Sequence, residues 1–93
     1  MARSWPAKDP NDVLDYQIDW SRRLDAGDSI GNAAFSLAVP AGLTIVSQSF
    51  TANSATVWLS GGNAGQTAQI LCRISTAGGR QMDITTRLAI AEQ

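Results

Sequence analysis

The stretch 67–90 reads TAQILCRIST-AGGR-QMDITTRLAI, and it decides the fold class. Apolar side chains recur at every second position before the central glycines, at Ala68, Ile70, Cys72 and Ile74, and the alternation continues after them at Met82, Ile84, Thr86, Leu88 and Ile90. A period of two is typical of a half-buried β-strand. Gly78 and Gly79 supply the positive φ angles that a two-residue hairpin loop needs. The stretch therefore predicts a β-hairpin.

Four earlier segments show the same alternation, at residues 13–20, 29–39, 43–50 and 55–59. The side chains that we expect to point inward are Tyr16, Ile18 and Trp20, then Ala33, Phe35, Leu37 and Val39, then Leu43, Ile45 and Ser47, and finally Val57 and Leu59. In the first segment a helix competes, because Leu14, Ile18 and Leu24 also lie at helical spacing, but its β-forming residues favour a strand. The pattern predicts six strands, or seven if the region of Ile30 is separate. That number and the spacing of the turns indicate an all-β, immunoglobulin-like antiparallel β-sandwich.

The first residues carry no periodic pattern and hold Pro6 and Pro10. We expect an extended N-terminal arm at residues 1–11 and one sandwich domain at residues 12–93. A chain of 93 residues has room for one such domain.

Composition excludes several classes of partner. The net charge is −1 and the basic residues are scattered, so no basic face is present to bind nucleic acid. No apolar run approaches the roughly 20 residues that span a membrane. The single cysteine and the absence of an apolar signal core predict folding in the cytoplasm.

The side chains of most catalytic sites are missing. The sequence has no histidine, which removes the usual general base and the usual zinc ligand. Cys72 falls on the apolar face of its strand, where we expect a buried, inert thiol. Asp15 and Asp19 share a face, but four strand residues span about 13 Å, too far for one ion without a bend. A calcium site remains the minor alternative to a solvated or subunit-facing acidic edge. We expect no enzyme, no cofactor and no metal.

Binding residues are easier to nominate. Trp20 ends an alternating run and is expected in the core. Trp58 lies on the face opposite Val57 and Leu59, so it is a candidate interface anchor. Arg22 and Arg23 either balance the nearby aspartates or dock onto a carboxylate of another subunit. The candidate interface residues are Trp5, Pro6, Asp15, Asp19, Arg22, Arg23 and Trp58.

Two blocks of the sequence resemble a known family. The first block is KDPNDVLDYQIDW at residues 8–20, followed by Leu24 and by GDSI at residues 27–30. The second is VWLSGG at residues 57–62, Gly65 and ISTAGGR at residues 74–80. Over residues 8–90 the chain resembles small immunoglobulin-like virion proteins of tailed bacteriophages, the fibre–tail adaptors.

The resemblance implies a structural role without catalysis. It implies a multi-copy protein in the virion tail, assembled in the host cytoplasm, which joins tail fibres or spikes to the tail tube or nozzle, and we expect a homo-oligomeric ring. A capsid decoration or head–tail joining protein is the alternative within phages. A carbohydrate-binding module is the alternative from another class, and it would need exposed aromatic side chains on one flat face, for which only Trp58 and Tyr16 are available.

Overall fold

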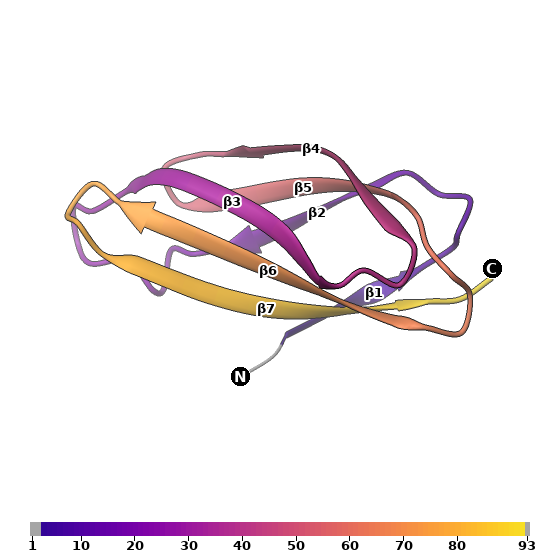
Figure 1. Ribbon diagram of the computed structural model, residues 1–93. Helices are drawn as coiled ribbons and strands as arrows, with labels where there is room; N and C mark the ends of the chain where they lie inside the picture. Colours follow the sequence, from indigo (N-terminus) through magenta and orange to yellow (C-terminus); the bar gives the residue numbers. More distant parts are fainter. Residues whose placement is uncertain (1–2, 93) are drawn as a thin grey trace.

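The computed structural model describes residues 3–92, which form seven strands in two layers (Figure 1). The strands are β1 (Arg3–Lys8), β2 (Leu14–Asp19), β3 (Ile30–Val39), β4 (Leu43–Phe50), β5 (Ser54–Gly61), β6 (Thr67–Thr76) and β7 (Gln81–Ile90). Sheet A has the order β1-β7-β6-β3, and sheet B has the order β2-β5-β4. The predicted all-β, immunoglobulin-like sandwich is confirmed.

The core lies between the two sheets and is built from the alternating positions. Ile18 and Trp20 on the β2 side, Val57 and Leu59 on β5, and Ile70 on β6 are fully buried. Because successive strand residues point to opposite faces, each of these strands has one apolar and one outward-facing row. The strand prediction for residues 13–20 is therefore confirmed over a helix.

The hairpin of β6 and β7 is confirmed, although its loop is longer than predicted. The amide of Gly79 donates to the carbonyl of Thr76 at 3.0 Å, and the amide of Thr76 donates to the carbonyl of Arg80 at 2.8 Å. Only one of the two glycines, Gly79, has a positive φ, of 91°. A turn closed by one left-handed residue is a three-residue hairpin loop, which needs one such glycine rather than two.

The N-terminal segment is not a free arm, because β1 is an edge strand of sheet A. It pairs with β7 in parallel, with Trp5 opposite Leu88, and the register shifts between Trp5 and Lys8. Pro6 falls within this shift, and a residue without an N–H is tolerated on an edge strand. The two prolines hid the strand from the sequence pattern, and so did a lysine in an inward position.

Lys8 is that inward lysine, and it is fully buried. Its ammonium donates to the carbonyl of Gly61 at 2.7 Å and to that of Asp9 at 2.9 Å. Buried charges persist only where hydrogen bonds replace water. The side chain thus ties the end of β1 to the end of β5, across the two sheets.

Irregular pairing on β3 and β4 overturns two expected inward positions. Val39 is exposed, because the register of β3 against β6 shifts between Leu37 and Val39. Ser47 is exposed too, because a bulge between Ile45 and Ser47 inserts Val46 into β4. An inserted residue reverses which side chains face the core.

Candidate interaction surfaces

The outer face of sheet B is a polar surface with one large aromatic side chain. Antiparallel pairing places Trp58 of β5 between Asp15 of β2 and Ser47 of β4. The next row holds Gln17, Thr56 and Ser49. Side chains that are directly opposite in a sheet are neighbours on its surface. Asp15 and Trp58, both predicted from the sequence to contact a partner, therefore lie side by side.

Trp58 is the side chain on this face with the most apolar area to offer. It is 41% exposed, whereas Val57 and Leu59 on either side of it are fully buried. The alternation of β5 thus forces the indole outward. Exposed tryptophans are enriched among the residues that dominate binding energy in protein interfaces.

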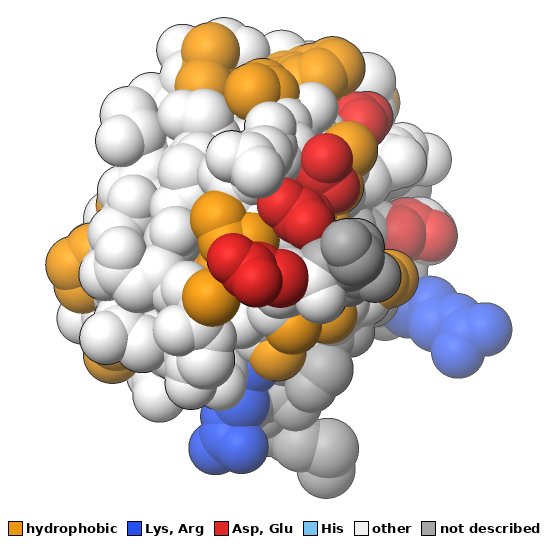
Figure 2. Space-filling view, turned by 90° about the vertical axis from the view of Figure 1, so that its right-hand side faces the viewer, with side chains coloured by type: hydrophobic (Ala, Val, Ile, Leu, Met, Phe, Trp, Pro, Cys, Tyr) orange, Lys and Arg blue, Asp and Glu red, His pale blue; other side chains and the backbone are white. Residues whose placement is uncertain are grey.

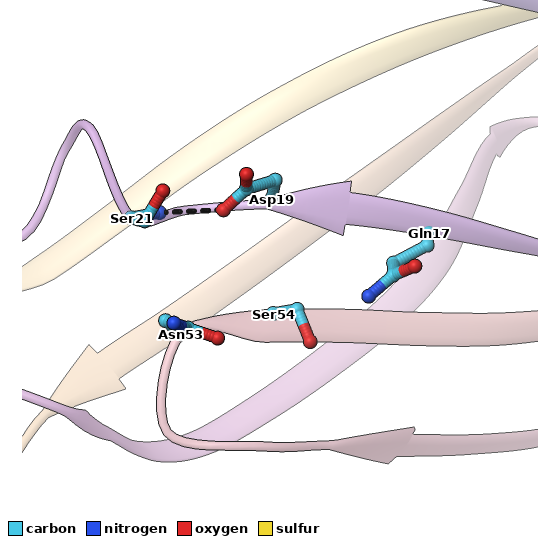
Figure 3. Close-up of a pocket in the computed structure, with 5 residues that line it drawn as sticks. All are labelled: Gln17, Asp19, Ser21, Asn53 and Ser54. Carbon is cyan, nitrogen blue, oxygen red and sulfur yellow. Dashed lines mark hydrogen bonds between the residues drawn. The ribbon is translucent and has the colours of Figure 1, made fainter.

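A shallow hollow of about 320 Å³ lies at one end of the same face (Figure 3). Its lining comes from β2, from β5 and from the connections beside them, namely Gln17, Asp19, Ser21, Asn53 and Ser54. The amide of Ser21 donates to a carboxylate oxygen of Asp19 at 2.9 Å, which turns the chain as it leaves β2. Asp19 is thus part of a local turn as well as a surface group.

Trp5 packs within its own chain. Its ring stacks on that of Tyr16, with centroids 4.8 Å apart and planes inclined by 27°. The stack covers Tyr16, which is buried. Burial raises the pKa of the Tyr16 hydroxyl, and the charges of Asp12 and Asp15 raise it further. Trp5 is therefore not held out on an arm as the sequence suggested, although Pro6 beside it is exposed.

Arg22 and Arg23 lie in the connection from β2 to β3, and both are exposed. The guanidinium carbon of Arg23 lies 5.7 Å from the ring centroid of Trp20, within the range of a cation–π contact. Trp20 itself is fully buried, as predicted. The nearby carboxylate of Asp25 pairs with Arg80 at 3.0 Å. Arg23 thus covers a core tryptophan.

The end of the sandwich that holds the β1–β2 connection carries carboxylates beside hydrophobic side chains (Figure 2). Asp9 and Asp12 belong to this connection, and the amide of Asn11 donates to the Asp9 carboxylate at 2.8 Å. Within residues 3–92, no three acidic or cysteine side chains come together as a metal site. The same residues include no helix of the length and apolarity that a membrane crossing requires.

Cys72 is fully buried on the inner face of β6. Burial raises the pKa of its thiol from 9.0 to about 11. The thiolate is the reactive form of cysteine, so a raised pKa makes the group inert. The expectation of a structural thiol is confirmed.

Sequence reasoning missed a second group of surface residues. Val13, directly before β2, and Leu14, its first residue, are exposed, and so are Val46 and Phe50 on β4. The bulge puts Phe50 opposite the buried Ala55, on the inner face of β4, yet Phe50 is not covered there. The sequence did contain a signal for the bulge, because the neighbouring apolar residues Ile45 and Val46 cannot both lie on one face of a regular strand.

Comparison with known proteins identifies a family. Residues 8–89 match the model of a family described as "Podophage GP4 fiber-tail adaptor protein gp77". No curated protein matches the chain.

Proposed function

The chain belongs to the podophage GP4 fibre–tail adaptor family, and we propose that it joins tail fibres or spikes to the tail tube or nozzle of the virion without doing any chemistry. Its work is to hold proteins together, in a homo-oligomeric ring assembled in the host cytoplasm. The observation that supports this most directly is the exposed Trp58 at the centre of the outer face of sheet B. A rigid sheet with an uncovered aromatic anchor is a surface suited to a protein partner.

The surroundings of Trp58 set the chemistry of the partner surface. Asp15 borders the indole on β2, Ser47 borders it on β4, and Asp19 lies farther along β2 on the same face, opposite Ser54. Arginine makes strong, geometrically specific pairs with carboxylates. The proposed partner therefore presents an apolar pocket for Trp58 with arginine or lysine beside it. At the end of this face, Arg22 is available to a partner carboxylate.

The carbohydrate-binding alternative has lost one of its two aromatic side chains. Tyr16 is buried under Trp5 and does not reach the outer face. Trp58 is then the one exposed aromatic side chain on the outer face of sheet B, within the described residues. A flat sugar platform normally needs more than one, so we favour a protein partner.

The position of the chain in the intact particle tests the proposal. We expect cryo-electron microscopy of purified virions to show symmetric density for the sandwich between the tail and the fibres, with Trp58 covered. Copies spread over the capsid lattice would instead establish a decoration protein. Absence from the particle would overturn the proposal.

Substitution of Trp58 tests the anchor separately. Virions assembled with Trp58→Ser should lose fibres, and those with Trp58→Tyr should keep most of them, because tyrosine retains an amphipathic ring. Both purified variants should melt near the temperature of the parent, since the side chain is outside the core. Normal fibre occupancy in Trp58→Ser virions would remove Trp58 from the interface.

A further inference from the structure

Sheet B has two free edges, formed by the different strands β2 and β4. Its order is β2-β5-β4, and both outer strands run antiparallel to β5. β2 and β4 are therefore parallel to each other. In the described part of the chain neither has a second strand partner, because β1 pairs with β7 in sheet A. An edge strand presents a row of backbone N–H and C=O groups that another strand can pair with.

Apart from Trp58 on the central strand β5, the exposed large hydrophobic side chains described in sheet B and beside it lie at these two edges. Val13, directly before β2, and Leu14, its first residue, are 54% and 37% exposed, and Val46 and Phe50 on β4 are 56% and 41% exposed. Sheet A contributes one such residue among those described, Val39 at the end of β3. Apolar area in water is unfavourable, and clusters of it on a soluble domain mark contact sites.

The β4 edge also lacks the usual protection against pairing. Residues 29–72, which include β3, β4 and β5, contain no charged side chain. Edge strands of monomeric proteins commonly carry a lysine, a proline or an inward-pointing charge that prevents edge-to-edge association. β4 has none of these. Its bulge at Val46 interrupts the strand but leaves residues 47–50 in regular pairing with β5.

The side chains of the two edges are complementary. On the outer face, β4 carries the hydroxyls of Ser47 and Ser49, because they lie opposite Trp58 and Thr56. On the same face, β2 carries the carboxylates of Asp15 and Asp19. A hydroxyl donates to a carboxylate, whereas two β2 edges would bring like charges together. A β4 edge therefore fits a β2 edge better than β2 fits itself.

We propose that β4 of one copy pairs in parallel with β2 of the next copy, so that sheet B continues from subunit to subunit. The contact is head to tail, and a head-to-tail contact closes into a ring when its rotation divides a full turn. The inference deepens the ring proposed above by naming its contact surfaces. A β4-to-β4 contact between two copies would be antiparallel and would leave Val13 and Leu14 in water.

Three exposed valines allow a matched test on the purified full chain. Val13→Lys places a charge on the β2 edge, Val46→Lys places one on the β4 edge, and Val39→Lys makes the same change on sheet A as a control. We expect the parent and Val39→Lys to associate as concentration rises in sedimentation equilibrium. Each edge variant alone should stay monomeric, with self-association weakened by at least about tenfold, because a lysine buried without a partner is costly.

A mixture of the two edge variants gives the decisive result. Equal amounts of Val13→Lys and Val46→Lys should form dimers and nothing larger, because one intact β4 edge and one intact β2 edge remain in each pair. Circular dichroism should show all three variants folded. Association of Val13→Lys like the parent would point to β4-to-β4 pairing and overturn the inference, and so would a parent that stays monomeric at millimolar concentration. Neither result would displace the chain from the tail, which the virion density tests independently.

Discussion

The backbone amide of Phe35 on β3 donates a hydrogen bond of 2.8 Å to the side-chain oxygen of Gln48 on β4. The bond crosses from sheet A to sheet B on the side where both sheets have a free edge. Phe35 is buried, and the amide donor beside it would otherwise lack a partner at that edge. The side chain of Gln48 thus links the two sheets through a hydrogen bond.

Replacing Gln48 with leucine should destabilise the fold by about 1 kcal/mol, because it removes the acceptor but keeps the size of the side chain. Gln48→Glu keeps an oxygen in the same place and is the control. Urea denaturation followed by tryptophan fluorescence measures the free energies of unfolding. Equal stabilities for the leucine variant and the parent would show that water replaces Gln48 without loss.

Gly42 lies in the tight turn between β3 and β4, where a side chain would be strained and would displace that of Asn63. Its φ is 81°, and an added Cβ would lie 2.7 Å from the side chain of Asn63. Gly65 also has a positive φ, of 83°, but an added Cβ there meets nothing within 4 Å. Gly65→Ala should cost about 1–2 kcal/mol from backbone strain alone. Gly42→Ala should cost only slightly more, because the exposed end of the Asn63 side chain must move but can do so cheaply. A much larger cost for Gly42→Ala than for Gly65→Ala in thermal unfolding would show that Asn63 is held in place.

The sequence was informative wherever a strand keeps an unbroken period of two. β2, β5, β6 and β7 bury the residues that alternation selects, from Ile18 to Ile90. Trp58 could be recognised as a surface residue for the same reason. A regular strand offers only two faces, so one buried row fixes the position of the other.

Alternation failed where the strands are irregular or where burial is achieved by a polar group. The bulge at Val46 reverses the faces of β4, which a count along the chain cannot anticipate. β1 was missed because Lys8 is buried through carbonyls of Asp9 and Gly61, and Gly61 lies far along the chain. The edges of sheet B could not be found either, because strand order is a property of the tertiary fold.

Cys72 should resist thiol reagents while the domain is folded. Its thiol is fully buried and has a pKa of about 11, so almost no thiolate is present or accessible at pH 8. Labelling by a disulfide reagent should be slow in buffer and fast in denaturant. Rapid labelling of the native protein would mean that β6 opens readily.

The same raised pKa makes the fold less stable in alkaline buffer. The folded state keeps the Cys72 proton above the ordinary pKa of 9.0, at which the unfolded chain loses it. Stability should therefore fall as pH rises from that value toward about 11, by about 2–3 kcal/mol from this group. Tyr16 acts in the same direction, so Cys72→Val is needed to separate the two. The valine variant should show a shallower decline than the parent in urea denaturation at each pH.

Asp28 should stabilise the end of the sandwich that holds the β6–β7 hairpin loop, and acid should abolish this stabilisation. The backbone amide of Ser29 lowers the pKa of this carboxyl most, followed by a hydrogen bond from the Thr76 side chain. The Asp28 carboxylate also accepts from the amide of Gly78 at 2.9 Å, which ties the β2–β3 connection to the loop of the β6–β7 hairpin. Because the pKa of Asp28 is lower in the folded protein than in the unfolded chain, its contribution to stability is complete when the pH is above the pKa of the unfolded chain. That contribution is lost as the pH falls through the pKa of the folded protein.

Asp28→Asn should therefore melt at a lower temperature than the parent at pH 7, and the difference should shrink toward zero in strongly acidic buffer. Asp15→Asn removes the same charge from the outer face of sheet B and controls for the change in net charge. Its melting temperature should stay close to that of the parent at pH 7. A difference between Asp28→Asn and the parent that is the same at every pH would show that the side chain acts through its shape and not through its charge, because only the charged form of Asp28 is lost in acid.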